Sequence, residues 1–122
     1  MNVPSDLQYT EHDEWIRVEG STLTIGISDY AQDQLGEIVH VELPEVGDEL
    51  AAGDAGCEVE SVKAVAEVYC PVGGTVVAVN EDLEDAPESV NEDPYGAWLF
   101  KIEASEDLTG TMDAAAYSAK IG

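Results

Sequence analysis

Short runs of β-branched and other apolar residues recur along most of the chain, separated by Gly, Pro, Asn and Asp. This pattern is typical of β-strands joined by tight turns. The runs at 15–19 and 22–27 flank a Glu-Gly-Ser sequence and predict a hairpin. Further strands are predicted at 38–43, 56–62, 65–70, 75–79 and 98–102, with a short one among the turn residues of 47–54. Many short strands at close spacing predict a small β-barrel or sandwich.

Two segments predict helices at the edges of this β-structure. Ser28 can cap a helix over 29–35, and Gly36 can end it. Thr111 is predicted to cap an Ala-rich helix over 112–120. The acidic segment 81–91 contains a proline and is predicted to be a loop with one helical turn. No linker divides the chain, so we expect one domain over residues 1–122.

The charge balance is extreme, with four Lys or Arg against 27 Asp or Glu and a net charge of −23. Such a polyanion repels phosphate backbones and anionic lipid heads, so we expect neither nucleic-acid nor membrane binding. Because 44% of the residues are apolar, the chain can still bury a core. The carboxylates are spread along the chain, and salt at about 1 M would screen their repulsion. We therefore expect a halophilic, cytoplasmic protein.

Few residues suggest metal binding, catalysis or disulfide formation. His12 stands among acids but is expected to be surface, and no metal site is predicted. His40 is expected to be a half-buried strand residue without a catalytic role. Cys57 and Cys70 are too few and too far apart for a disulfide scaffold, and we expect free thiols. No pattern of a nucleophile with its base is present, so the protein is not expected to be an enzyme.

Lys63 differs from the other cations in its sequence context. It stands between two predicted strands, where a tight turn would present its amine at a protruding tip. An edge lysine can discourage sheet aggregation, but a chain that uses carboxylates for solubility has less need of it. A catalytic amine would need burial or neighbouring cations to lower its pKa, and these surroundings are anionic. A covalent attachment point fits better.

The residues around Lys63 resemble the lipoyl-lysine hairpin of the glycine cleavage system H proteins. The resemblance extends over nearly the whole chain and in the same order. The matching segments are 9–10 and 12–15, 26–32, 35–39, 41–47, 60–64 with Pro71 and Gly74, 79–81, Pro87, Asn91, 93–96 and 98–99.

The resemblance implies a mainly β fold, a barrel-sandwich hybrid with short flanking helices. It implies a lipoyl group on Lys63 that accepts the aminomethyl group of glycine from a pyridoxal-phosphate glycine decarboxylase. The arm would present this group to a tetrahydrofolate-dependent aminomethyltransferase and be reoxidised by dihydrolipoamide dehydrogenase. A lipoate-attaching enzyme is a further implied partner, and we expect a monomer.

The family also shelters the loaded arm in a cleft lined by two carboxylates. Glu14 and Glu67 occupy the matching positions, although the family more often has aspartate at the second. A carboxylate can hold a cationic amine by a charge-assisted hydrogen bond. Glu14 and Glu67 are therefore candidates for sheltering the arm.

Three other kinds of carrier share a modified lysine in a hairpin turn. Lipoyl domains of 2-oxo acid dehydrogenases lack the N-terminal Trp-containing hairpin and the C-terminal end present here. Biotin carriers have methionines around the lysine, whereas Val62 and Ala64 flank Lys63. An H-like protein that relays lipoate to other proteins remains an alternative.

Overall fold

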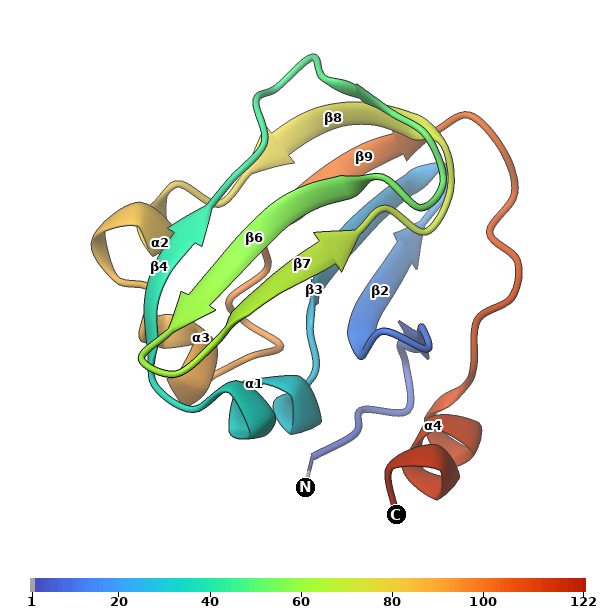
Figure 1. Cartoon of the computed structure of the whole chain (residues 1–122). Helices are drawn as coiled ribbons and strands as arrows, with labels where there is room; N and C mark the ends of the chain where they lie inside the picture. Colours follow the sequence, from blue (N-terminus) through green and yellow to red (C-terminus); the bar gives the residue numbers. More distant parts are fainter. Residues whose placement is uncertain (1) are drawn as a thin grey trace.

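Two antiparallel β-sheets face each other across a shared apolar core (Figure 1). The computed structural model describes residues 2–122. The larger sheet has the strand order β1 (Gln8–Tyr9), β2 (Glu14–Glu19), β3 (Thr22–Ile27), β9 (Phe100–Ala104), β8 (Gly74–Val79) and β5 (Glu49–Leu50). The smaller sheet has the order β4 (Ile38–Glu42), β6 (Ala55–Ser61) and β7 (Val65–Tyr69).

Alternation along the strands fills the core from both sheets. Leu23, Ile25 and Ile27 of β3 are buried, and Val59 and Val68 of the smaller sheet belong to the same cluster. Successive side chains of a strand point to opposite faces, so every second residue of these strands faces inward. The predicted hairpin of β2 and β3 is present, with Glu19 opposite Thr22.

Helix α1 (Asp29–Leu35) forms where the sequence predicts it. The Ser28 hydroxyl oxygen accepts a hydrogen bond from the Ala31 N–H at 3.1 Å. Gly36 ends the helix at a φ of 79°, and its N–H donates to the Gln32 carbonyl. The cap and stop residues therefore act as predicted.

The C-terminal helix α4 (Ala114–Ile121) does not begin at the predicted cap. Asp113 caps it, because its carboxylate accepts from the Ala116 N–H at 2.8 Å. The Thr111 hydroxyl instead donates to Gln8 at 3.2 Å. Segment 81–91 also differs from the prediction, since it contributes to two short helices, α2 (Asp82–Asp85) and α3 (Ser89–Glu92).

Two predictions about strand residues were wrong in detail. The last strand begins at Phe100, because Trp98 leaves the sheet and packs against a second apolar cluster. His40 is exposed and not half-buried, since in β4 it lies two residues from Ile38 across a break in the pairing register.

That second apolar cluster lies between the N-terminal segment and α4, outside the main core. Its fully buried members are Leu7, Tyr9, Trp15 and Tyr117. The Trp15 indole N–H donates to the Pro94 carbonyl at 2.9 Å. Gly26 is required beneath it, because a β-carbon there would lie 2.5 Å from the Trp15 ring. Figure 1 shows α4 beside the N-terminal segment.

Cys57 and Cys70 are free and buried in the main core, which agrees with the prediction of free thiols. Burial raises the pKa of Cys57 to about 12 and that of Cys70 to about 11. Both thiols are therefore unreactive at neutral pH. Among residues 2–122, no helix combines the length and the apolar composition needed to cross a membrane.

Candidate carrier site at the Lys63 hairpin

Lys63 lies in the turn that joins β6 to β7, as the spacing of the two strands predicted. Glu60 pairs with Val65, and residues 62–64 form the turn between Ser61, the last residue of β6, and Val65. The Ser61 N–H donates to the Ala64 carbonyl at 2.8 Å. The Ser61 hydroxyl oxygen accepts from the N–H groups of Lys63 and Ala64 at 3.2 and 3.0 Å. A polar side chain thus fixes the turn while Lys63 stays exposed.

The turn between α1 and β4 packs against this hairpin and is hydrogen-bonded to it. The Val62 N–H donates to the Glu37 carbonyl at 3.0 Å. The Lys63 side chain runs over Gly36, where an added β-carbon would lie 3.4 Å from the Lys63 Cε. Figure 1 shows the tip of the β6–β7 hairpin next to α3 and α1. The outer part of the Lys63 side chain therefore lies against the α1–β4 turn.

The side-chain amide of Asn91, in α3, forms hydrogen bonds to that turn with both its oxygen and its nitrogen. Its Oδ1 accepts from the Ile38 N–H at 2.8 Å. Its Nδ2 donates to the Gly36 carbonyl at 2.8 Å and to the Gln32 side chain at 2.9 Å. The end of α1 and the start of β4 are thereby joined through one amide group.

A cleft of about 190 Å³ opens between α1, β7 and the segment before β2. It contains both carboxylates that were expected to shelter the arm, Glu14 and Glu67. Lys63 lies outside it, three residues before Ala66, the first residue of β7 that lines it. The remaining lining residues are His12, Asp13, Ile27, Ala31, Gln34, Leu35 and Val68.

Glu14 is 2% exposed, an unusual environment for a carboxylate. It accepts hydrogen bonds from the Thr10 hydroxyl at 2.7 Å and from the Tyr69 N–H. Burial raises the pKa of Glu14, and the two donors and the nearby His12 partly offset this effect. The two donors compensate a buried charge that would otherwise be unpaired.

Glu67 differs from Glu14 because it is exposed. It lies opposite Glu58 in the β6–β7 ladder. Its negative charge and a hydrogen bond raise the pKa of the Tyr69 hydroxyl. Glu67 is therefore placed at the open side of the cleft, and Glu14 at its buried side.

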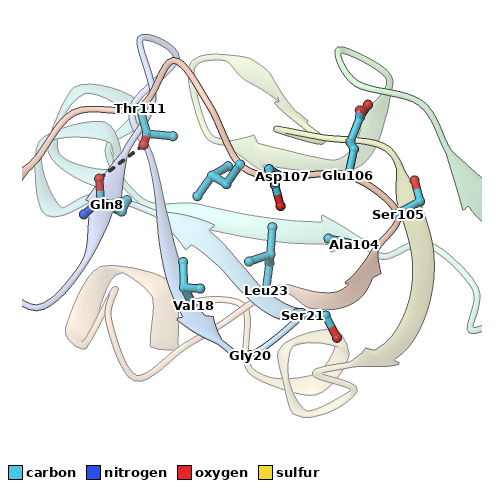
Figure 2. A pocket seen from close by; sticks show the side chains of 11 residues that line it. Gln8, Val18, Gly20, Ser21, Leu23, Ala104, Ser105, Glu106, Asp107 and Thr111 are labelled. Atoms are coloured by element: carbon cyan, nitrogen blue, oxygen red, sulfur yellow. Dashed lines mark hydrogen bonds between the residues drawn. The ribbon is translucent and has the colours of Figure 1, made fainter.

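The molecule has several other pockets. A pocket of about 500 Å³ shares His12 and Glu14 with the cleft. Glu14 therefore lines both the cleft and this pocket. Another of about 670 Å³ lies between the β2–β3 turn and the segment after β9 (Figure 2). Its lining, which includes Val18, Leu23 and Glu106, contains none of the predicted site residues.

The sequence did not identify the residues that support the site. Thr10 and Asn91 belong to the segments that carry the resemblance, but nothing in the sequence gives them a role. The Tyr69 contact to Glu14 uses the backbone, which no sequence pattern reports. Lys120 is one of only four cations in this chain, and this scarcity is a usable signal.

Known proteins of one family resemble this chain over nearly its whole length. A sequence model of the family described as "Glycine cleavage H-protein" matches residues 7–121. The chain belongs to the glycine cleavage H-protein family. The H protein is a carrier and not a catalyst, and members of the family carry lipoate.

Named relatives support the same assignment over almost the full length. A "Glycine cleavage system H protein" of Idiomarina loihiensis is 55% identical, over 98% of this chain and 96% of the relative. A "Probable glycine cleavage system H protein" of Pyrococcus horikoshii is 55% identical, over 95% and 90%. The crystal structure of a glycine cleavage system H protein from Mycobacterium marinum superposes with a TM-score of 0.91 at 35% identity, covering 98% of this chain and 99% of that one. The predicted barrel-sandwich hybrid is confirmed.

Proposed function

We propose that this protein carries a lipoyl group on Lys63 and shuttles the aminomethyl group of glycine. The proposed donor is the pyridoxal-phosphate glycine decarboxylase, and the acceptor is the tetrahydrofolate-dependent aminomethyltransferase. Dihydrolipoamide dehydrogenase would reoxidise the arm, and a lipoate-attaching enzyme would install it. The observation that supports the proposal most directly is an exposed lysine on a braced hairpin beside a cleft that contains Glu14 and Glu67.

The surroundings of Lys63 fit amide formation at its amine. Within residues 2–122, no carboxylate lies within ion-pair distance of the Lys63 Nζ. Val62 and Ala64 on either side are exposed, so another protein can reach the amine from several directions. Once attached, the lipoyl group supplies the dithiolane chemistry of group transfer. The hairpin supplies its position and a high effective concentration at successive partners.

Glu14 and Glu67 are proposed to shelter the cationic amine of the loaded arm. A carboxylate in a water-poor cleft attracts a cation more strongly than one in water. The nearby cation would in turn favour the ionised form of Glu14, against the effect of burial. Glu67 at the open side would contribute less, because solvent screens it.

The rate at which the loaded protein loses its aminomethyl group by hydrolysis, to formaldehyde and ammonia with the thiol regenerated, tests this assignment. We expect Glu14→Gln to accelerate the loss on the order of tenfold, and Glu67→Gln less. Glu19→Gln, on an exposed strand end, is the control and should match the wild type. A rate in Glu14→Gln equal to that of the control would remove Glu14 from this role.

Reconstitution with the partner enzymes tests the function as a whole. We expect Lys63→Arg to abolish glycine cleavage, because arginine keeps the charge but cannot be lipoylated. Lys101→Arg, which alters a lysine stacked over Trp98, should keep it. Full activity in Lys63→Arg would refute the proposal. A lipoylated protein that passes lipoate to other carriers but does not support glycine cleavage would favour the relay alternative.

We further propose that the protein is a monomeric carrier domain over residues 1–122 and works in a salt-rich cytoplasm. The outer face of the smaller sheet supports the proposal of a salt-rich cytoplasm. Glu42, Glu58 and Glu67 stand side by side across its three strands. Like charges in such positions destabilise a sheet in dilute buffer, and concentrated salt removes most of the repulsion.

A further inference from the structure

Asp13, the residue before Glu14, has a backbone conformation that must be held from outside. Among residues 2–122 it is the one non-glycine residue with a positive φ, 66°. Such a conformation is strained for residues with a side chain and persists where the surroundings enforce it. Because Glu14 follows directly, the contacts that hold Asp13 also constrain the backbone from which the Glu14 side chain extends.

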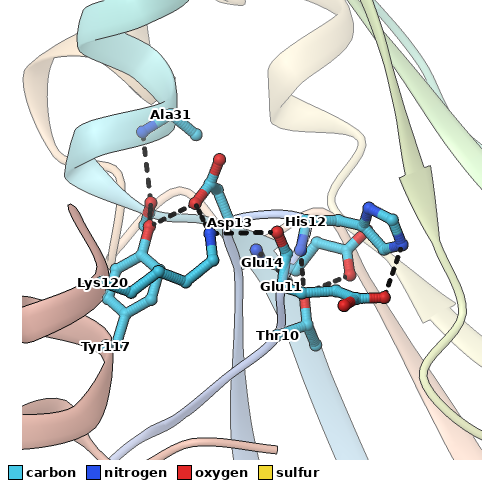
Figure 3. A network of polar contacts seen from close by, with 9 residues as sticks. Thr10, Glu11, His12, Asp13, Glu14, Ala31, Tyr117 and Lys120 are labelled. Carbon is cyan, nitrogen blue, oxygen red and sulfur yellow. Dashed lines mark hydrogen bonds and ion pairs between the residues drawn. The ribbon is translucent and has the colours of Figure 1, made fainter.

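The Asp13 N–H donates to the Thr10 carbonyl at 3.2 Å, and helix α4 supplies the contacts of the Asp13 side chain (Figure 3). The Tyr117 hydroxyl donates to the Asp13 carboxylate at 2.9 Å. It also lies 2.6 Å from the Ser28 hydroxyl, which accepts from the Ala31 N–H. Tyr117 has one hydroxyl proton and gives it to Asp13, so Ser28 must donate to Tyr117. One relay of hydrogen bonds thus joins α1, α4 and Asp13.

Lys120, one turn further along α4, adds a second contact to the same segment. Its Nζ lies 3.8 Å from the Asp13 carboxylate and donates to the Glu11 carbonyl at 3.3 Å. It is one of four cations in a chain with 27 acids. A cation in the last turn of a helix favours the helix dipole. Lys120 does more than this, because it contacts two residues of another segment.

Tyr117 is itself firmly placed. It is fully buried, and its ring stacks on that of Tyr9 at 4.6 Å between centroids and 4° between planes. The backbone of Asp13 completes the connection, since its carbonyl accepts from the Ser28 N–H at 2.9 Å. Asp13, Glu14 and Ala31 all line the cleft. The C-terminal helix therefore fixes two walls of a cleft that it does not itself line.

We propose that Tyr117 and Lys120 form a latch, the α4 latch, that positions Glu14 for sheltering the loaded arm. They are positioning residues, because they act through Asp13 and not on the arm. The inference rests on the proposed function of Glu14. It adds that the shelter depends on a helix more than a hundred residues away in the sequence.

The first test measures geometry without any lipoyl group. The Tyr69 N–H donates to Glu14, so its amide-proton chemical shift reports the position of the carboxylate. We expect Tyr117→Phe to move this resonance in the direction seen in Glu14→Gln. The change keeps the ring stack on Tyr9 and removes one hydroxyl. Lys120→Gln, at an exposed position, should move it in the same direction by less.

Tyr95→Phe is the matched control. Tyr95 packs against the same apolar cluster, accepts from the Asp29 N–H at 3.1 Å and donates to the Asn2 carbonyl at 2.6 Å. It has no hydrogen bond to Asp13. We expect Tyr95→Phe to lower stability about as much as Tyr117→Phe and to leave the Tyr69 amide unchanged.

The second test measures hydrolytic loss of the aminomethyl group, as formaldehyde and ammonia, from the loaded full-length protein. We expect Tyr117→Phe to accelerate it about threefold or more, and Tyr95→Phe to have no effect. An unchanged Tyr69 resonance in both Tyr117→Phe and Lys120→Gln would overturn the latch. So would an unchanged rate in Tyr117→Phe when Glu14→Gln is fast. If Glu14→Gln itself were slow, the sheltering role would fail, and the Tyr69 resonance would still decide whether the latch exists.

Discussion

Replacement of Gly36 by alanine tests how the Lys63 hairpin is supported. Gly36 has φ 79° and ψ −154°, a region that is essentially closed to residues with a side chain. Forcing alanine into it costs about 1–3 kcal/mol. For a chain of this size we expect the melting temperature to fall by roughly 4–12 °C. The new β-carbon would also touch the Lys63 side chain, at 3.4 Å from Cε.

The rate of lipoylation should distinguish Gly36→Ala from substitutions at other glycines. Gly36→Ala should slow lipoylation by the lipoate-attaching enzyme on the order of tenfold, because the turn that anchors Val62 shifts. Gly47→Ala is the control, since Gly47 has a φ of 99° with open space around its α-carbon. We expect it to melt earlier but to be lipoylated normally. An unchanged melting temperature in Gly36→Ala, or equal lipoylation in both variants, would refute the reasoning.

Three further predictions concern stability. Burial raises the pKa of Glu14 above its unfolded value, so stability is lost as pH rises through that window. Measured from denaturant midpoints, Glu14→Gln should therefore be more stable than the wild type above about pH 4.3 and equally stable at lower pH. A stability difference that stays constant with pH would contradict this. Removing the middle charge of the carboxylate row in Glu58→Gln should stabilise the protein by about 0.5 kcal/mol in dilute buffer. Thermal melts in rising KCl should show this gain vanish near about 1 M, and a wild-type melting temperature that falls with KCl would exclude salt adaptation. Asn91→Ala removes three hydrogen bonds and should cost about 2 kcal/mol, measured by chemical denaturation, and a loss near zero would show that the α1–β4 turn does not depend on it.

The sequence predicted the local features because local chemistry determines them. Ser28 and Gly36 bound a helix through contacts within four residues, and both act as expected. The Lys63 turn follows from the distance between two apolar runs. The cap of α4 was wrong because Thr111 and Asp113 are both good caps. Their competition was decided by the pairing of Met112 with Tyr9, which keeps Thr111 outside the helix.

The candidate site was predictable in its residues but not in its geometry. Glu14 and Glu67 came from the family resemblance, in a chain where a carboxylate at any position is common. Their unequal burial depends on contacts between distant segments. Glu14 meets the backbone of Tyr69 across 55 positions, and Tyr117 meets Asp13 across 104. No periodicity in a single sequence reports such contacts.

Peptide mass analysis of the protein purified from its native host tests the central claim most directly. The account predicts one lipoyl group, on the peptide that contains Lys63. Peptides containing Lys101 or Lys120 should be unmodified. A lipoyl group on either of these, or complete absence of modification from protein that is active in glycine cleavage, would contradict the account.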